Sequence, residues 1–237
     1  MRAATGSLRA DTVVLATEAY TADLPGHRRD VLPMFSTMVV TDLLGAEFWD
    51  RAGWSGRECV SAASHRYFYA QRTADDRIAL GGRGKVYEFG SGTGGQWRLD
   101  ARTVRGLQEE VRGLFPAGRI TFAHAWGGVL GVPRDWAPYI DVSADHRLAR
   151  VGGYVGQGVT AAHVAGRTLA EVLTGTDSPL RDSPWIRRRP RRWEPEPLRW
   201  IGTHAVQTLF SLAQRAESRR GDARTSRWAA VADRITR

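Results

Sequence analysis

The chain has 237 residues, of which 42% are apolar and 25% are charged, a composition that is ordinary for a globular protein. No apolar run in the sequence is long enough to span a membrane, and the first residues do not resemble a signal peptide. The single cysteine, Cys59, excludes an intramolecular disulfide and is typical of a reducing compartment. We therefore expect a cytoplasmic protein with no membrane partner.

The formal charge of +9 lies almost entirely near the C-terminus. Residues 1–180 hold 20 basic and 19 acidic side chains, whereas residues 181–237 hold 14 basic and 6 acidic ones, around the run RRRPRR at 187–192. An arginine cluster can bind phosphate backbones, but a charge run is more often a solvated surface. A nucleic-acid partner is therefore an alternative that the sequence does not favour.

The first 42 residues predict a hairpin and two strands. Residues 1–10 form the hairpin, with a turn at Gly6 and Ser7, and residues 11–17 are apolar enough for a strand buried on both faces. A long strand is expected within residues 31–42. Since the strand at 11–17 has no visible partner, we expect a segment of the protein to precede Met1.

The middle of the chain predicts an aromatic strand at 66–72, a turn at 73–77 and a returning strand at 78–82. Residues 90–95 satisfy G-x-G-x-x-G, but they do not lead directly into a helix. We interpret them as a surface loop and not as a dinucleotide-binding fingerprint. A helix is expected from Asp100, its N-cap, to Pro116, followed by a strand at 120–130.

A glycine-dense turn at residues 152–158 is the most informative feature. It joins a short strand at 148–151 to a helix that ends at Gly175. Glycines ahead of a helix allow a ligand to approach the backbone, and the N–H groups of the first turn favour an electron-rich or anionic group. The same pattern is also typical of an ordinary strand–turn–helix packing unit. The residues expected on the buried face of this helix are Val159, Ala162, Gly166, Leu169, Ala170 and Leu173.

The C-terminal part predicts a proline-rich connector and then a helix over residues 198–219. One face of this helix is apolar at helical spacing, so we expect that face to be buried. Its members are Leu198, Ile201, Ala205, Leu209, Leu212 and Ala216.

Six parts of the sequence stand in an order that resembles one enzyme family. They are ADTVVLATEAYT (10–21), YFY (67–69) with GGRG (81–84), HAWGG (124–128), DWAPYI (135–140), GGYVGQGVTAAHVAGRTLAEVL (152–173) and RWEPEPLRW (192–200). Together they resemble the FAD-dependent amine and amino-acid oxidoreductases of the D-amino-acid-oxidase superfamily, above all the gamma-glutamylputrescine oxidase-like branch. The glycine-rich βαβ segment with which that family begins has no counterpart here.

The resemblance implies an α/β (α+β) fold for what looks like the C-terminal portion of such an enzyme. Residues 29–140 would form a mixed-sheet substrate domain. Residues 1–28 and 141–176 would form an incomplete Rossmann-like FAD-binding domain, and residues 177–237 a connector and helical tail. The implied partners are a small-molecule amine and the missing N-terminal FAD-binding segment, encoded upstream or on a second chain.

The resemblance also implies FAD as cofactor and a hydride transfer from the carbon beside an amine to flavin N5, after which the imine is hydrolysed. Negative charge then develops at the pyrimidine edge of the flavin, where a helix N-terminus stabilises it. The residues expected to bind FAD are Ala16 and Thr17 on the adenosine and pyrophosphate side, and Gly153, Gly156, Gln157, Gly158, Val159 and Thr160 near the ring. Plain packing at the end of a strand is the alternative for Ala16 and Thr17.

The resemblance defines the substrate-binding residues and the catalytic groups less closely than the residues that bind FAD. Tyr69 and Trp126 are candidates for an aromatic wall beside Leu130, with core packing as the alternative. No catalytic residue is identified. His65 is a candidate for proton removal, and Lys85 for oxygen activation, while a structural histidine and a surface lysine are the alternatives.

The substrate class follows from two missing arginines. Glycine-oxidase-like members clamp a carboxylate with arginines at positions that correspond to Leu130 and Gly156. Their absence favours an amine over a free α-amino acid, unless Arg66 or Arg134 supplies a clamp. Two other hypotheses remain open: a non-enzymatic module that binds nucleic acid or an anionic surface through its arginines, and a non-functional fragment with exposed strand edges.

Overall fold

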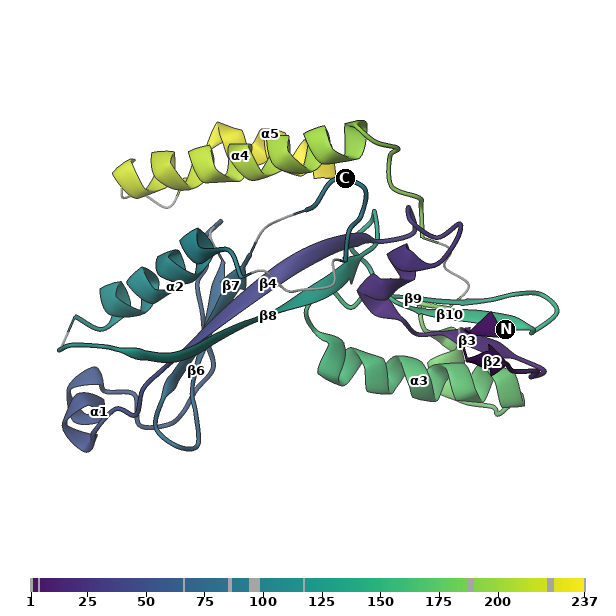
Figure 1. Ribbon diagram of the computed structural model, residues 1–237, viewed down its shortest axis with the longest axis horizontal. Helices are drawn as coiled ribbons and strands as arrows, with labels where there is room; N and C mark the ends of the chain where they lie inside the picture. The colour runs from purple at the N-terminus through teal and green to yellow at the C-terminus, as the bar shows by residue number, and fades with distance from the viewer. Residues whose placement is uncertain are drawn as a thin grey trace. The chain divides into compact units, whose positions relative to one another are not determined.

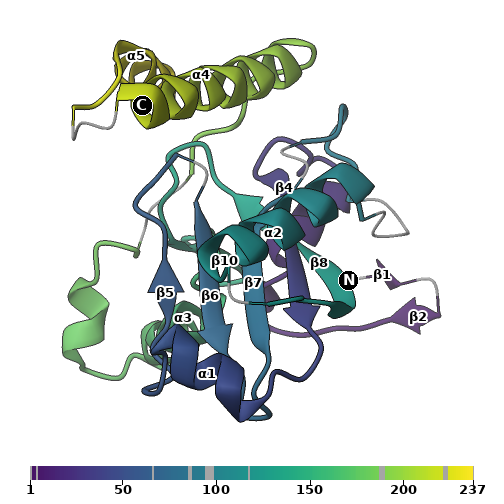
Figure 2. The ribbon, with the colours of Figure 1, turned by 90° about the vertical axis from the view of Figure 1, so that its left-hand side faces the viewer.

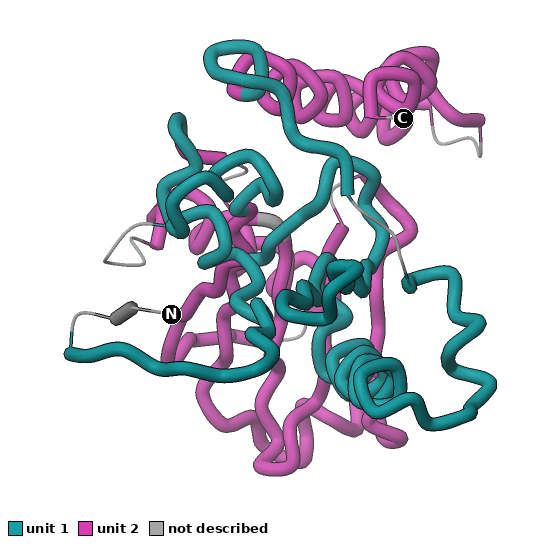
Figure 3. The backbone as a smooth tube through the Cα atoms, turned by 90° about the vertical axis from the view of Figure 1, so that its right-hand side faces the viewer, with its two compact units in different colours: residues 1–33, 89–93, 130–199 teal, residues 34–88, 94–129, 200–237 magenta. Residues whose placement is uncertain are grey.

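A computed structural model describes residues 2–3, 5–65, 67–84, 87–93, 99–116, 118–186, 190–220 and 224–236. The chain divides into two compact units, each assembled from three segments (Figure 3). The first unit comprises residues 1–33, 89–93 and 130–199, and the second comprises residues 34–88, 94–129 and 200–237. The domain scheme expected from the sequence places its boundaries after residues 28, 140 and 176 instead. Strands and helices occur in both units, which confirms the predicted α/β class.

The first unit is built on a small mixed sheet of order β3-β10-β9. β10 pairs with β3 in parallel and with β9 in antiparallel fashion, while β1 and β2 form an N-terminal hairpin in which Gly6 and Ser7, the residues expected in the turn, lie in β2 instead. The elements of this unit are β1 (Arg2–Ala3), β2 (Gly6–Ser7), β3 (Val13–Leu15), the 3-10 helix η1 (Glu18–Asp23), β9 (Tyr139–Val142), β10 (Leu148–Gly152), α3 (Gly158–Thr174) and the 3-10 helix η2 (Pro179–Asp182).

β3 differs from its prediction. The sequence indicates a strand buried on both faces, and this is wrong, because the side chain of Val14 is 44% exposed. β3 is the edge strand of its sheet: Val14 pairs with Ala149 on one side, and no described strand pairs with the other side. An apolar run therefore indicates a strand that could be buried, and the number of neighbouring strands decides whether it is.

α3 packs against the sheet of the first unit (Figure 1) and buries Ala165, Thr168 and Leu169. The predicted buried face is only partly correct. Leu169 is buried, but Val159 is 96% exposed, and the small residues of the same face are exposed as well. Alanine and glycine fit a buried or an exposed position, so their spacing does not fix the rotation of a helix. The exposed small residues of this face are Ala162, Gly166 and Ala170.

The second unit is built on a larger sheet of order β5-β6-β7-β4-β8. β6 and β7 form the predicted hairpin, and β7 then pairs with β4 in antiparallel fashion. Short end portions of β4, β8 and α4 belong to the first unit. The elements are β4 (Leu32–Thr41), α1 (Ala46–Ala52), β5 (Val60–Ser61), β6 (Phe68–Arg72), β7 (Ile78–Arg83), α2 (Ala101–Leu114), β8 (Phe122–Val132), α4 (Leu198–Arg220) and α5 (Arg227–Thr236).

Two adjacent glycines of β7 allow close packing on opposite faces of this sheet. A Cβ at Gly81 would lie 2.4 Å from the ring of Tyr69, which therefore rests on the backbone of β7. A Cβ at Gly82 would lie 2.9 Å from Leu107 of α2, on the face that α2 covers (Figure 2). Successive residues of a strand point to opposite faces. The pair thus admits a helix on one face and an aromatic ring on the other.

α2 begins as predicted, because the carboxylate of Asp100 accepts a hydrogen bond from the backbone N–H of Thr103 at 2.9 Å. This bond and the hydroxyl of Thr103 hold the pKa of Asp100 below its usual value. The helix buries Val111 against the apolar face of the sheet, which includes Val39 and Leu80.

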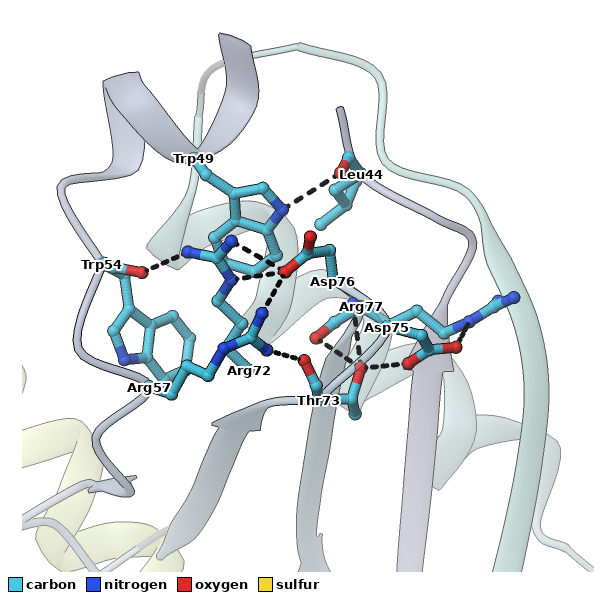
Figure 4. A network of polar contacts seen from close by, with 9 residues as sticks. All are labelled: Leu44, Trp49, Trp54, Arg57, Arg72, Thr73, Asp75, Asp76 and Arg77. Atoms are coloured by element: carbon cyan, nitrogen blue, oxygen red, sulfur yellow. Dashed lines mark hydrogen bonds and ion pairs between the residues drawn. The ribbon is translucent and has the colours of Figure 1, made fainter. Parts of the chain in front are cut away.

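A polar network fixes the turn between β6 and β7 to α1 (Figure 4). The guanidinium of Arg72 lies 4.0 Å from the ring centroid of Trp49, and it donates to the carbonyl of Trp54 at 2.9 Å. It also donates to Asp76 at 2.9 Å, and Arg57 donates to the same carboxylate at 2.8 Å. The bond from Arg72 is the main reason that the pKa of Asp76 is lowered. Every group in this network is engaged in holding the hairpin.

The loop that was expected at the surface is partly buried in the first unit. Ser91 is buried, and its hydroxyl donates to the carbonyl of Arg28 at 3.0 Å. The backbone N–H of Gly90 donates to Glu196 at 3.0 Å. Residues 94–98 lie outside the described residues. In the part that is described, the loop is a packed connection, and no helix follows it before α2.

α4 confirms the predicted C-terminal helix, whereas α5 is not anticipated by the sequence analysis. The predicted buried face of α4 is wrong, because Leu198, Ile201 and Leu212 are exposed. The side chains of α4 that are buried include Arg199 and Ala213. Among the helices described, none is both long enough and apolar enough to cross a lipid bilayer.

Candidate functional site

The expected cofactor residues meet at one edge of the first unit's sheet. β3 and β10 are parallel neighbours with Leu15 opposite Arg150, so the residues that follow the two strands emerge at the same edge. Ligands of α/β sheets bind at the carboxyl ends of parallel strands. The structure therefore brings together two groups that are far apart in the sequence. They are Ala16 and Thr17 after β3, and Gly153, Gly156, Gln157, Gly158, Val159 and Thr160 after β10.

The turn between β10 and α3 depends on glycine. Gly153 has a φ of +79°, and a Cβ there would lie 2.9 Å from Pro133 and 3.0 Å from the carbonyl of Ala137. Gly156 has a φ of +96°. α3 then begins at Gly158, and no side chain caps it at Gln157. The first N–H groups of a helix have no intrahelical partner. This helix start therefore presents backbone donors and a positive dipole end to a ligand.

Glu18 is a functional candidate that the sequence analysis missed. Its carboxylate accepts hydrogen bonds from the backbone N–H of Gly131 and, at 3.4 Å, from that of Tyr154. Burial raises the pKa of Glu18, while bonds from Gly131, Tyr154 and Gly153 oppose that rise. Glu18 has a φ of +46°, a conformation that residues other than glycine rarely adopt. It joins the end of β3 to the glycine turn.

Two tyrosines surround this carboxylate in the first unit. Tyr139 is buried, and its hydroxyl lies 3.0 Å from where a Cβ at Gly152 would be. Burial is the main cause that raises the pKa of Tyr139, and the charge of Glu18 adds to it. The pKa of Tyr154 is raised for the same two reasons. Both phenols therefore remain neutral at physiological pH.

The glycine turn has an apolar neighbour at the end of β8. A Cβ at Gly156 would lie 3.9 Å from Leu130, so these two positions are adjacent in space. Neither carries a charge. Arg134, which was considered as a substitute carboxylate clamp, donates to Glu194 at 3.0 Å and lies 5.3 Å from the ring centroid of Trp193. Its guanidinium is thus held by groups of its own unit. Arg66, the other clamp considered, lies outside the described residues.

The expected substrate aromatics lie in the second unit. Tyr69 is 37% exposed, and its hydroxyl lies 3.2 Å from that of Ser36 on β4. Trp126 is 39% exposed and stacks on His124 with ring centroids 6.0 Å apart. Both rings are thus held on strands of the sheet with a large part of their surface accessible.

His65 has a structural partner in the C-terminal helix. Its Nε2 lies 3.1 Å from the carboxylate of Glu217, its backbone N–H donates to Gln214 at 3.0 Å, and its ring stacks on Phe210. Hydrogen bonds that the carboxylate of Glu217 accepts from the backbone of Ser226 and from the ring of His65 hold the pKa of Glu217 below its usual value. His65 therefore attaches α4 to the loop between β5 and β6. Lys85, the other catalytic candidate, lies outside the described residues.

The model of one protein family, FAD dependent oxidoreductase, matches residues 2–172. The chain belongs to this family. The predicted resemblance is confirmed, and FAD is the cofactor that the family uses.

Relatives in this family include enzymes of amine and amino-acid metabolism. The chain is 28% identical over 194 residues to the D-amino acid dehydrogenase of Methylobacterium sp. (strain 4-46), a match that covers 79% of this chain and 44% of that protein. It is 28% identical over 178 residues to the gamma-glutamylputrescine oxidoreductase of Escherichia coli (strain K12), covering 74% of this chain and 39% of the relative. The chain thus spans less than half the length of these relatives.

Solved structures of similar fold include oxidases. Iminodiacetate oxidase from Chelativorans sp. BNC1 superposes with a TM-score of 0.61 at 21% identity, covering 79% of this chain and 48% of the oxidase. Glycine oxidase from Geobacillus kaustophilus has a TM-score of 0.60 at 18% identity, again over 79% of this chain and 48% of the oxidase. At these identities the likeness establishes the fold.

The residues of the first unit that are expected to bind FAD fit a flavin ring. At Gly156 of the turn only Leu130 lies within 4 Å of where a Cβ would be, at 3.9 Å, so a flat ring can approach the backbone there, whereas Gly153 packs against Pro133 and Ala137. Val159 in the first turn of α3 is almost fully exposed, so nothing in the described first unit covers the helix start. Backbone donors at a helix N-terminus suit the electron-rich pyrimidine edge of a flavin.

Proposed function

We propose that this chain forms the flavin-ring and substrate portion of an FAD-dependent oxidoreductase that oxidises the carbon–nitrogen bond of an amine. The observation that carries the proposal is the meeting of the β3 end and the glycine turn at one sheet edge, in a chain of this family. FAD, when bound, supplies the acceptor for the hydride. The chain's own residues then orient the ring and stabilise charge.

The role of α3 in this proposal is electrostatic. The N–H groups of Gly158, Val159 and Thr160 begin the helix, and its dipole places partial positive charge at the same point. Donors that are fixed before the reaction stabilise developing negative charge without reorganising. These three residues would therefore favour the reduced state of the ring.

The substrate class in this proposal is an amine without an α-carboxylate next to the reacting carbon. The adjacent Leu130 and Gly156 offer no positive charge, and Arg134 is paired with Glu194. A bidentate arginine is the usual partner of a substrate carboxylate. Tyr69 and Trp126 supply the aromatic surface in this proposal. A gamma-glutamylputrescine-like amine fits this description, whereas a D-amino acid would need a clamp from another residue.

The partner in this proposal is a dinucleotide-binding segment of the glycine-rich βαβ type. Two features of the first unit support it: the outer edge of β3 has no described partner strand, and α3 exposes the small residues Ala162, Gly166 and Ala170. Strand edges and small-residue helix faces are surfaces against which further strands and helices pack. Such a segment would be encoded upstream of Met1 or on a second chain, and we propose that the assembled enzyme is cytoplasmic.

The substrate class is tested by comparing amines with α-amino acids. For the chain assembled with its dinucleotide-binding segment, we expect kcat/KM for gamma-glutamylputrescine to exceed that for D-alanine by about 100-fold, because a carboxylate left without its partner costs about 3 kcal/mol. Leu130→Arg should raise kcat/KM for D-alanine, and Leu130→Met serves as the size-matched control. Faster turnover of D-alanine by the unaltered protein contradicts the proposed substrate class.

A further inference from the structure

Glu18 occupies an unusual position in the first unit. It directly follows the residues at the end of β3 and opens η1, with its backbone in the left-handed region at φ +46°. Such a conformation in a residue other than glycine persists where the surrounding structure enforces it, and it often marks a functional site. The carboxylate of Glu18 makes hydrogen bonds that can hold this conformation.

The carboxylate of Glu18 joins three separate pieces of backbone. It accepts from Gly131 near the end of β8 and from Tyr154 in the turn after β10, while its own backbone follows β3. A Cβ at Gly131 would lie 2.3 Å from this carboxylate and 2.8 Å from the backbone nitrogen of Ala19. Position 131 therefore accommodates no side chain, because the first turn of η1 and the Glu18 carboxylate fill that space.

These contacts act on the part of the turn that precedes the helix start. Tyr154 stands between the two left-handed glycines of the turn, Gly153 and Gly156. Glycine loses more conformational freedom on ordering than any other residue, so a turn built on two glycines needs an anchor to keep one shape. A charged acceptor bound to backbone donors is among the stronger anchors available.

We propose that Glu18 is a positioning residue that holds the glycine turn, and with it the N–H groups at the start of α3, in the shape that receives the flavin ring. This inference rests on the proposed function and adds to it a residue for which no role is assigned. Glu18 acts through the backbone of residues 153–156. The pKa of Glu18 is raised by burial, which is the expected state of a carboxylate kept from water by this packing.

Two variants distinguish the effect of the Glu18 carboxylate from the effect of the left-handed backbone conformation at this position. Glu18→Gln keeps the length of the side chain and removes one of its two acceptor oxygens. Glu18→Gly removes both and relieves the left-handed conformation, so the chain stays folded while the anchor is lost. Glu47→Gln is the control, because Glu47 forms an exposed pair with Arg51 on α1 and belongs to the second unit.

The first measurement is amide hydrogen exchange in the chain itself. We expect the exchange of the Gly131 and Tyr154 amides to accelerate about tenfold in Glu18→Gln and more in Glu18→Gly, and to stay unchanged in Glu47→Gln. The reason is that the loss of one hydrogen bond costs about 1 kcal/mol, which corresponds to about a tenfold change in the opening equilibrium. Unchanged exchange in both Glu18 variants overturns the inference.

The second measurement is made on the protein assembled with its dinucleotide-binding segment. We expect the Glu18 variants to bind FAD about tenfold more weakly and to lower the reduction potential of the bound flavin, because the N–H groups are less well placed. Faster amide exchange with unchanged FAD affinity and potential overturns the positioning role. Failure of the unaltered assembly to bind FAD contradicts the proposed function, and the flavin-positioning role with it, whatever the amide exchange shows.

Discussion

Replacing Gly153 by alanine is expected to lower the free energy of unfolding of the chain by about 3 kcal/mol and to abolish retention of flavin by the protein assembled with its dinucleotide-binding segment. The residue has a φ of +79°, which costs a residue with a Cβ about 1 kcal/mol. The added methyl would also lie 2.9 Å from Pro133 and 3.0 Å from the carbonyl of Ala137, a clash of the kind that costs about 1–3 kcal/mol. The shape of the turn would change with it.

The matched control for this substitution is Gly166→Ala. Gly166 lies inside α3, and a Cβ there meets nothing within 4 Å. Alanine is favoured over glycine in a helix by about 1 kcal/mol, so this variant should be slightly more stable than the unaltered chain. Urea denaturation measures the free energy of unfolding of both variants. Equal stabilities for the two alanine variants contradict the account of the turn.

Replacing Arg199 by alanine is expected to destabilise the first unit by about 3 kcal/mol. Arg199 is 2% exposed, and its guanidinium binds Glu196 at 3.1 Å and the carbonyl of Arg28 at 3.0 Å. Removing one partner of a buried ion pair leaves the other charge without compensation, which costs about 3–5 kcal/mol. Glu196 also accepts from Gly90, so the loop at 89–93 should loosen together with the C-terminal segment.

Arg51→Ala is the control for this buried pair. Arg51 forms an exposed pair with Glu47 at 2.8 Å, of the kind that contributes less than about 0.5 kcal/mol. Thermal unfolding at matched pH should separate the two variants by about 5–10 °C, given about 2–4 °C per kcal/mol for a protein of this size. A shift for Arg199→Ala no larger than that for Arg51→Ala contradicts the assignment of Arg199 as a structural centre.

Much of the second unit could be predicted because its signals are local. Apolar and aromatic runs predict β4 and β6, the polar turn after β6 predicts the return of β7, and the carboxylate of Asp100 three residues before Thr103 predicts the start of α2. The left-handed glycines and the helix start at Gly158 follow from the glycine spacing. Each of these features depends on residues within a few positions of one another.

The buried faces of α3 and α4 could not be predicted with the same certainty. α3 carries six alanine and glycine residues, Gly158, Ala161, Ala162, Ala165, Gly166 and Ala170, so hydrophobic spacing alone does not decide which side of it packs. α3 turns Ala165, Thr168 and Leu169 to the sheet, and α4 leaves Leu198 and Ile201 exposed. What a helix buries depends on which other elements lie beside it, and that information is not local.

The roles of Glu18 and His65 are also non-local. Glu18 reaches Gly131, and His65 reaches Glu217, across more than one hundred residues of sequence. A charged residue in an apolar run was the available signal for Glu18. The segment RWEPEPLRW is similar: its Trp193 donates from the indole to the carbonyl of Val132 at 2.8 Å. The segment resembles a family motif, and in the structure this bond attaches it to the end of β8.

The most direct measurement is flavin retention. The chain should be purified alone and together with the polypeptide encoded immediately upstream, and the absorbance of bound flavin near 450 nm, on the order of one FAD per chain, should be measured in each. The account predicts that the chain alone is colourless and that the assembled protein retains FAD. Stoichiometric flavin on the chain alone, or an upstream region without a glycine-rich βαβ segment and an assembly without flavin, would contradict it.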